Sequence, residues 1–312
     1  MGYEAKSRQA NGLFIATFIA ISFAPNLFLT ASVVSTALHG MLPEQYQAQY
    51  TMIRWAIAAL PFMVVFFLLN YFWLSRRYAP KGEGNKKVDM SYIEERYKAL
   101  GAWKKEEKIM GIIVLVAVLL WVFKGVHGIA EWIVTAFALC ACFIFKIMNG
   151  KDFRYGVPWE SLIFIFCAVS LGNVLPAVGI TEWLSTAIGP YTEQFFSNPF
   201  LVIIGLSVMT MLVRFLILSE TGYLAVATAI CIPLALVAGV SPWIVAFILN
   251  VFVPVWFLPY QSSMYLTTLY SCGEDYVTTK GTTSYCWAYC LFAIVSLFVA
   301  YFVWQATGVW FA

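Results

Sequence analysis

Long runs of apolar residues, separated by shorter polar stretches, make up most of this chain. Most of the runs are close to the ~20 residues that a helix needs to cross the hydrocarbon layer of a bilayer. We therefore predict an all-α membrane protein, a polytopic helical bundle. The predicted apolar segments are residues 12–38, 52–74, 109–126, 129–148, 158–177, 199–218, 222–240, 243–270 and 285–305.

Two of these segments, 12–38 and 243–270, are longer, and each contains a proline among polar residues. The first break is centred on Pro25-Asn26 and the second on Pro259, and a Trp-Ala pair follows each at a similar distance. Non-helical backbone at membrane depth is tolerated only where protein buries it or where it lines a cavity. Paired interruptions in two halves of a chain are the best sequence pointer to the midplane site of a secondary transporter. We predict two discontinuous helices, each made of two short halves joined by an unwound loop.

A second interpretation of the breaks stays open, in which the prolines merely kink two helices and polar groups satisfy the interrupted backbone. The region between residues 199 and 240 also has two interpretations. Its two apolar arms are separated only by Ser219-Glu220-Thr221, which suits a re-entrant hairpin, here called the outer hairpin. Each arm is also long enough to cross the membrane fully.

The charged residues refine this picture. Only 11% of the residues are charged and 62% are hydrophobic, whereas soluble domains carry about 25% charged residues, so we expect an integral membrane protein. Ten of the nineteen Lys and Arg residues fall within 76–108, a linker that the positive-inside rule places on the cytoplasmic side of an inner or plasma membrane. We predict three parts: residues 1–75, the end of a first repeat; the linker 76–108, helical from residue 92; and residues 109–312, a second repeat with the outer hairpin and the second broken helix.

Several classes of function are disfavoured by the composition. The basic residues form no stripe with reading aromatics, so we expect no nucleic-acid partner. His39 and His127 have no second ligand at metal-binding spacing, and the seven cysteines contain no C-x-x-C pair. An intramembrane enzyme would need paired Asp residues, a nucleophile with a base, or a His-rich set. We expect neither enzymatic activity nor a cofactor.

An ordered set of short motifs resembles the divalent anion:sodium symporter family, the ion-transporter group of dicarboxylate, citrate and sulfate carriers. The set begins with Pro25-Asn26 and continues with the helix start from Trp55 to Pro61 and the basic linker. Its later members are Leu120-Trp121 before His127-Gly128-Ile129, Pro158-Trp159-Glu160-Ser161-Leu162, Ser170-Leu171-Gly172-Asn173 with Gly179-Ile180-Thr181-Glu182-Trp183, Ile232-Pro233 and Phe257-Leu258-Pro259.

The resemblance implies an inverted-repeat transporter. In that family two hairpins with Ser-Asn-Thr tips face two unwound loops and hold sodium ions and the substrate's carboxylates or sulfate. It also implies that the first repeat is incomplete here, because the chain looks like the C-terminal two-thirds of such a permease. We therefore expect a missing N-terminal half from a partner chain or an upstream reading frame, or a homodimer, which the family forms through its scaffold. Glu220 stands where the family's tip has Asn, and the second loop reads Pro-Tyr-Gln-Ser-Ser in place of a Thr-Pro-Pro-Asn pattern.

Hydroxyl, amide and backbone groups at the breaks have the chemistry that an oxyanion site needs. Helix N-termini at an unwound loop supply N–H groups and partial positive charge, and hydroxyl or amide side chains serve anions and cations alike. Arg214 and Glu220 have two interpretations: Arg214 attracts the anionic substrate while Glu220 binds the coupling cation or a proton, or the two side chains neutralise each other. The predicted substrate- and ion-binding residues are Pro25, Asn26, Thr30, Ser219, Glu220, Thr221, Gly222, Pro259, Gln261, Ser262 and Ser263, with Arg214 as a further anion contact.

The leading hypothesis is a secondary active transporter for small divalent oxyanions such as dicarboxylates, citrate or sulfate. It would be coupled to sodium or protons and would work by alternating access across the lipid bilayer. Two alternatives stay open: a truncated, nonfunctional transporter fragment, and a channel, which should show rings of like groups from symmetric helices.

Overall fold

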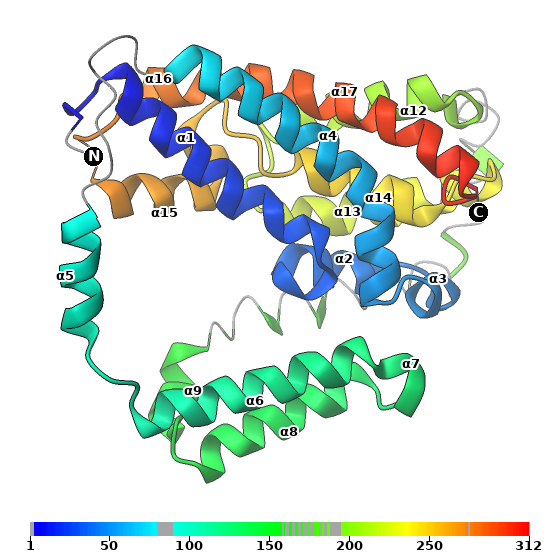
Figure 1. Ribbon diagram of the computed structural model, residues 1–312. Helices are drawn as coiled ribbons and strands as arrows, with labels where there is room; N and C mark the ends of the chain where they lie inside the picture. Colours follow the sequence, from blue (N-terminus) through cyan, green and yellow to red (C-terminus); the bar gives the residue numbers. More distant parts are fainter. Residues whose placement is uncertain are drawn as a thin grey trace. The chain divides into compact units, whose positions relative to one another are not determined.

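Helices form the regular elements of the chain in the part that the structure describes (Figure 1). The structure, a computed structural model, describes residues 3–79, 90–157, 195–273 and 275–311, with isolated positions between 158 and 194. Within these residues, the β-type pairing is confined to an isolated bridge between Val240 and Phe311. Four described segments are long and apolar enough to cross a membrane, namely Arg8–Leu27, Met52–Tyr78, Glu220–Val237 and Thr279–Ala306. The predicted all-α membrane fold is confirmed.

The chain divides into two compact units. One comprises Lys86–Ile163, and the other comprises Gly2–Asn85 together with Phe164–Ala312. The predicted boundaries of the three parts, at residues 75 and 108, stay predictions. The segment expected at 158–177, with its Pro158 to Leu162 and Ser170 to Asn173 motifs, falls largely outside the described residues.

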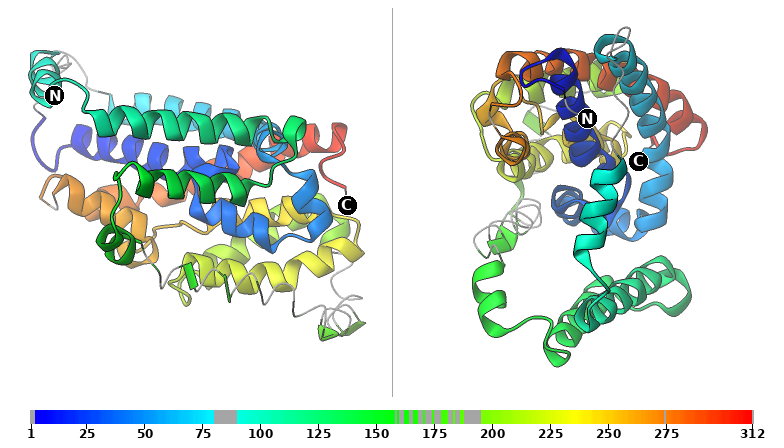
Figure 2. Two further views of the ribbon diagram at one scale, coloured as in Figure 1. Left: turned by 90° about the horizontal axis from the view of Figure 1, so that it is seen from below. Right: turned by 60° about the vertical axis from the view of Figure 1, so that its left-hand side comes forward.

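The unit Lys86–Ile163 is built around the antiparallel helices α6 (Lys105–Val122) and α8 (Glu131–Ile144), which lie side by side (Figure 1 and Figure 2). The turn between them contains α7 (Lys124–His127), and α9 (Gly150–Gly156) follows. The preceding helix α5 (Met90–Leu100) ends at Gly101, whose φ of 72° lies in the left-handed region. The prediction of continuous helix from residue 92 through the linker was therefore wrong, because a left-handed residue ends an α-helix.

The other unit is organised around helix α14 (Pro242–Phe252). All 11 of its residues are buried, as expected for a helix that is apolar on every side. Helices α12 (Pro199–Val213) and α13 (Glu220–Val237) both pack on it, although they follow each other in the chain. These two helices are the arms of the predicted outer hairpin, and whether they re-enter or cross the membrane stays open.

Two long helices of this unit pack together in opposite directions: α4 (Met52–Tyr78) and α17 (Tyr285–Ala306) (Figure 1). The indole Nε1–H of Trp304, near the end of α17, donates to the Ala58 carbonyl near the start of α4 at 2.7 Å. The hydroxyl of Tyr285, at the start of α17, donates to Asn70 Oδ1 near the end of α4 at 2.6 Å. Opposite directions of two equivalent helices are what an inverted repeat requires.

Both predicted interruptions are present. The first lies between α1 (Arg8–Phe23) and α2 (Val33–Met41) and contains two 3-10 turns, η1 (Ala24–Leu27) and η2 (Leu29–Ala31). The second lies between α14 and α15 (Ser263–Cys272) and contains the 3-10 turn η4 (Pro259–Gln261). The short helices α3 (Glu44–Gln49) and α16 (Thr279–Thr283) precede α4 and α17 respectively.

Candidate functional site

The first break ends in a serine-capped helix. Phe28 is extended, with φ −114° and ψ 130°, and the turn η2 follows it. Ser32 is extended again, and its side-chain oxygen accepts a hydrogen bond from the Ser35 N–H at 3.4 Å. This arrangement is an N-cap, in which serine satisfies one of the four N–H groups that a helix leaves without an internal partner.

The second break has the same backbone plan. Leu258 is extended, with φ −121° and ψ 141°, and the turn η4 follows it. Ser262 is extended, and its side-chain oxygen accepts from the Tyr265 N–H at 3.3 Å, which caps α15. Extended residue, 3-10 turn, serine cap and short helix therefore occur in the same order at both breaks.

This plan corrects the equivalence that the sequence suggested. The backbone matches Phe28 with Leu258 and Ser32 with Ser262, so that Pro25 lies in an additional turn, η1, ahead of the matched part. The two Trp-Ala pairs are also not equivalent, because Trp55 is fully buried whereas Trp287 is 67% exposed. The two prolines are the most visible common feature of the breaks in the sequence, but the serine caps determine where the second helix of each pair begins.

Arg214 connects the outer hairpin to the second break. It follows α12, has no exposed surface, and donates only to backbone carbonyls. Its Nε donates to the Val253 carbonyl at 2.8 Å and its Nη2 donates to the Gln261 carbonyl. Its Nη1 donates to the carbonyls of Ile217 at 2.5 Å and Leu218 at 2.7 Å. The guanidinium group therefore holds both ends of the unwound stretch 253–261 against the turn that follows α12.

These contacts bear on the second interpretation of Arg214, in which Arg214 and Glu220 neutralise each other. Its four donor contacts are made to peptide oxygens, not to Glu220, and no ion pair between the two side chains occurs in the described part of the chain. The two residues do interact electrostatically at longer range. The expected neutralising salt bridge is therefore wrong, because the carbonyls of the unwound segment take the donors of Arg214.

Glu220 begins α13 at the tip of the outer hairpin. Ser219 caps this helix by accepting from the Gly222 N–H at 3.0 Å, and its hydroxyl lies 3.5 Å from that of Thr221. The Oε1 atom of Glu220 is buried and has no hydrogen-bond partner among the described residues. A buried carboxylate is costly unless a cation, a proton or a hydrogen-bond donor neutralises it. The tip therefore has the chemistry to accept a monovalent cation or a proton.

Only some of the other predicted residues come together. Gln261 is fully buried, and its Oε1 accepts from the Leu258 N–H at 2.8 Å. The backbone carbonyl of Asn26 accepts from Trp55 Nε1 at 3.1 Å, which ties the first break to α4. Thr30 and Ser263 are exposed. Within the described residues, no hydrogen bond joins residues 22–32 to residues 257–263.

Two polar contacts that the sequence interpretation missed connect the helices around the breaks. Asn250 of α14 donates to the Ser35 hydroxyl of α2 at 3.2 Å, and both residues are buried. The hydroxyls of Thr210 and Tyr223 lie 2.7 Å apart and join α12 to α13. The cap at Ser32 was within reach of sequence reasoning, since a serine before a helical run is an N-cap signal. Asn250 carries no such signal, because it stands alone in an apolar run.

Comparison with known proteins places this fold in a family. The family model described as "Sodium:sulfate symporter transmembrane region" matches residues 3–311. The chain belongs to this family. The predicted resemblance is thus confirmed, and the sodium:sulfate symporter family is one of membrane transporters rather than enzymes.

Several curated relatives match parts of this chain. A putative malate transporter of Bacillus subtilis is 25% identical over 171 residues, which are 54% of this chain and 35% of the relative. A sodium-dependent dicarboxylate transporter of Staphylococcus aureus is 23% identical over 188 residues, 53% of this chain and 36% of the relative. The Escherichia coli inner membrane protein YbhI is 24% identical over 247 residues, 76% of this chain and 49% of the relative. The chain spans about half the length, or less, of the curated relatives it matches.

Proposed function

We propose that this chain forms part of a secondary transporter for small divalent oxyanions, dicarboxylates in the first place, with citrate and sulfate as further candidates. The observation that carries the proposal is the pair of matched breaks, each with an extended residue, a 3-10 turn and a serine-capped helix. Unwound segments of this kind are the binding elements of transporters with inverted repeats. The dicarboxylate and malate named in the titles of two relatives support the substrate class.

In this proposal the anion binds between the N-termini of α2 and α15. Both helices are long enough to have a positive end, and the partial charge and N–H groups there favour a carboxylate or sulfate. The exposed hydroxyls of Thr30 and Ser263 are proposed donors, one from each break. The remaining proposed contacts are those predicted from the sequence, namely Pro25, Asn26, Pro259, Gln261 and Ser262. Arg214 acts by holding the second unwound segment and not by touching the anion.

The coupling ion is proposed to bind at the tip of the outer hairpin, at Ser219, Glu220, Thr221 and Gly222. The buried, unpartnered Oε1 of Glu220 supports this assignment. Sodium would be coordinated by carboxylate and hydroxyl oxygens, and a proton would neutralise the carboxylate directly. The sodium dependence named for the S. aureus relative favours sodium. Alternating access would expose this region to each side of the membrane in turn, with the linker 76–108 in the cytoplasm.

Uptake into proteoliposomes tests the proposal. Labelled succinate, citrate and sulfate would be offered with an inward sodium gradient, an inward proton gradient, or neither. Two preparations would be compared: the purified chain alone, and the chain purified from its native membrane together with any protein bound to it. Saturable, gradient-driven uptake with counterflow is expected in at least one of the two preparations. Uptake by the chain alone would mean that a homodimer suffices for transport, whereas uptake only by the native preparation would mean that a partner chain is needed. Conductance that does not saturate, or the absence of succinate uptake in both preparations, would contradict the proposal.

A further inference from the structure

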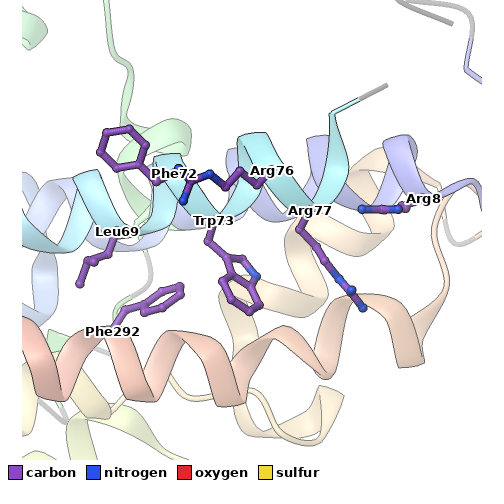
Figure 3. A pocket seen from close by; sticks show the side chains of 7 residues that line it. All are labelled: Arg8, Leu69, Phe72, Trp73, Arg76, Arg77 and Phe292. Atoms are coloured by element: carbon purple, nitrogen blue, oxygen red, sulfur yellow. The ribbon is translucent and has the colours of Figure 1, made fainter. Parts of the chain in front are cut away.

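A pocket lies at the end of α4 that is remote from the two breaks (Figure 3). It has a volume of about 420 Å³, which is within the ~300–1,000 Å³ typical of small-molecule sites. Its lining combines three guanidinium groups with an apolar floor. The lining residues are Arg8, Leu69, Phe72, Trp73, Arg76, Arg77 and Phe292.

Helical spacing and close packing bring these side chains together. Leu69, Trp73 and Arg76 recur at three- and four-residue intervals, so they lie along one face of α4. Trp73 points from α4 toward α17, where its ring packs against Phe292 with centroids 5.6 Å apart (Figure 3). Arg8 of α1 reaches the same pocket because α1 and α4 approach closely one turn later.

That close approach depends on Gly12. A Cβ atom at this position would lie 2.4 Å from Cβ of Tyr78, so only glycine permits the observed contact. Gly12 is one helical turn after Arg8, and Tyr78 directly follows Arg77 on α4. The glycine therefore positions a guanidinium group from each of two helices beside the same pocket.

The positive charge of the pocket has no ion-pair partner in the part of the chain that the structure describes. Arg8, Arg76 and Arg77 are all exposed, and none of them forms an ion pair with a carboxylate of the described residues. Beneath them, Phe72 and Trp73 are about half exposed, at 51% and 45%. A ligand that satisfies both features carries an anionic head and an apolar body.

The position of the pocket along α4 identifies the source of such a ligand. It is at the end of a candidate membrane span, where Trp side chains mark the boundary between hydrocarbon and headgroups. The basic linker follows directly, so we expect this end to face the cytoplasmic leaflet, in which anionic lipids attract Lys and Arg. We propose that this pocket binds the headgroup of an anionic phospholipid, with its phosphate on the arginines and its glycerol and upper acyl chain on Phe72, Trp73 and Phe292.

The lipid pocket is separate from the proposed transport site. Trp55, which contacts the first break, precedes Trp73 on the same helix, and the helical rise of 1.5 Å per residue puts them roughly 27 Å apart. An aqueous dicarboxylate would gain nothing from the aromatic floor. Success or failure of this inference is therefore independent of the uptake experiment.

Native mass spectrometry of the full chain in mild detergent tests the proposal. The protein would be titrated with dioleoylphosphatidylglycerol and, separately, with dioleoylphosphatidylcholine, which has the same chains and no net charge. The variant is Arg76→Gln/Arg77→Gln, and the matched control is Arg54→Gln, an exposed arginine at the other end of the same helix. A competition with excess inorganic phosphate separates a lipid site from a site for free anions.

We expect wild type and Arg54→Gln to prefer phosphatidylglycerol, and the double variant to lose about fivefold in affinity per arginine, or about twenty-fivefold for the two. Phosphate in excess should leave the bound lipid in place, because it cannot use the apolar floor. Equal binding of both lipids by wild type would overturn the proposal. So would an unchanged preference in the double variant, an equal loss in Arg54→Gln, or displacement of the lipid by phosphate.

Discussion

Replacing Arg214 by glutamine tests how the second break is held in place. Four backbone carbonyls, those of Val253, Gln261, Ile217 and Leu218, accept from this buried side chain. Each buried acceptor that loses its donor costs about 1–3 kcal/mol. Only the hydrogen bonds to Val253 and Gln261 are fully buried, and glutamine supplies one short amide group. We therefore expect Arg214→Gln to destabilise the protein by about 4 kcal/mol, the middle of that range for two buried acceptors.

The assay is thermal unfolding in detergent of the wild type, Arg214→Gln, Glu220→Gln and the double variant. Glu220→Gln alone should change the thermal stability little, because Oε1 of Glu220 has no hydrogen-bond partner among the described residues to lose. The double variant should regain less than half of the loss in Arg214→Gln, since neutralising Glu220 relieves only a long-range interaction. Exposed Arg54→Gln is the control and should unfold as the wild type does.

Full recovery of stability in the double variant would refute this reasoning. That result would mean that Arg214 and Glu220 act as a neutralising pair, and that the contacts to the carbonyls contribute little. Arg214→Lys should lose part of the stability. Lysine keeps the positive charge, but its ammonium group lacks the planar fork with which arginine reaches four carbonyls.

Three further predictions follow from single contacts. Ser32→Ala and Ser262→Ala should each destabilise the protein by about 0.5–2 kcal/mol through loss of the helix cap, and each should lower the uptake of succinate. Ser75→Ala, at an exposed serine, should have neither effect. Equal uptake by all three variants would argue against the caps as parts of the site. Gly12→Ala should cost about 1–3 kcal/mol in thermal unfolding because its Cβ meets Tyr78, while Gly125→Ala, which meets open space, serves as the control and should have little effect. Glu220→Gln should keep counterflow exchange of substrate but lose the stimulation of uptake by a sodium or proton gradient, and a wild-type response to the gradient would place the coupling ion elsewhere.

Apolar patterning predicted the helices well where a run is continuous. Residues 52–74 and 285–305 became α4 and α17 with small shifts at their ends, and Pro61 does not end α4 although it lies inside that helix. The two discontinuous helices were predictable as well, since proline and polar side chains disfavour continuous helix at membrane depth. The register between the two breaks was not predictable from prolines, because it depends on extended residues and serine caps.

The candidate site shows the limit of reasoning from one sequence. Arg214 and Gln261 are far apart in the chain, and the contact between them depends on packing around α14 that no local pattern encodes. The carboxylate oxygen Oε1 of Glu220 likewise lacks a hydrogen-bond partner among the described residues because Arg214 donates to peptide oxygens instead. The contact between Asn250 and Ser35 unites two segments whose polar residues each look isolated in the sequence.

Protection of the two breaks by substrate tests the central claim most directly. Single cysteines at Thr30 and Ser263, which are exposed residues of the first and second break, would be introduced after replacement of the seven native cysteines, with Ser75→Cys as a control on the far part of α4. Maleimide labelling rates would be measured with and without succinate and sodium, in the preparation that supports uptake. We predict that succinate slows labelling at both Thr30→Cys and Ser263→Cys and leaves Ser75→Cys unchanged. Unchanged labelling at both breaks, or protection at only one of them, would contradict a single anion site formed by the two unwound segments.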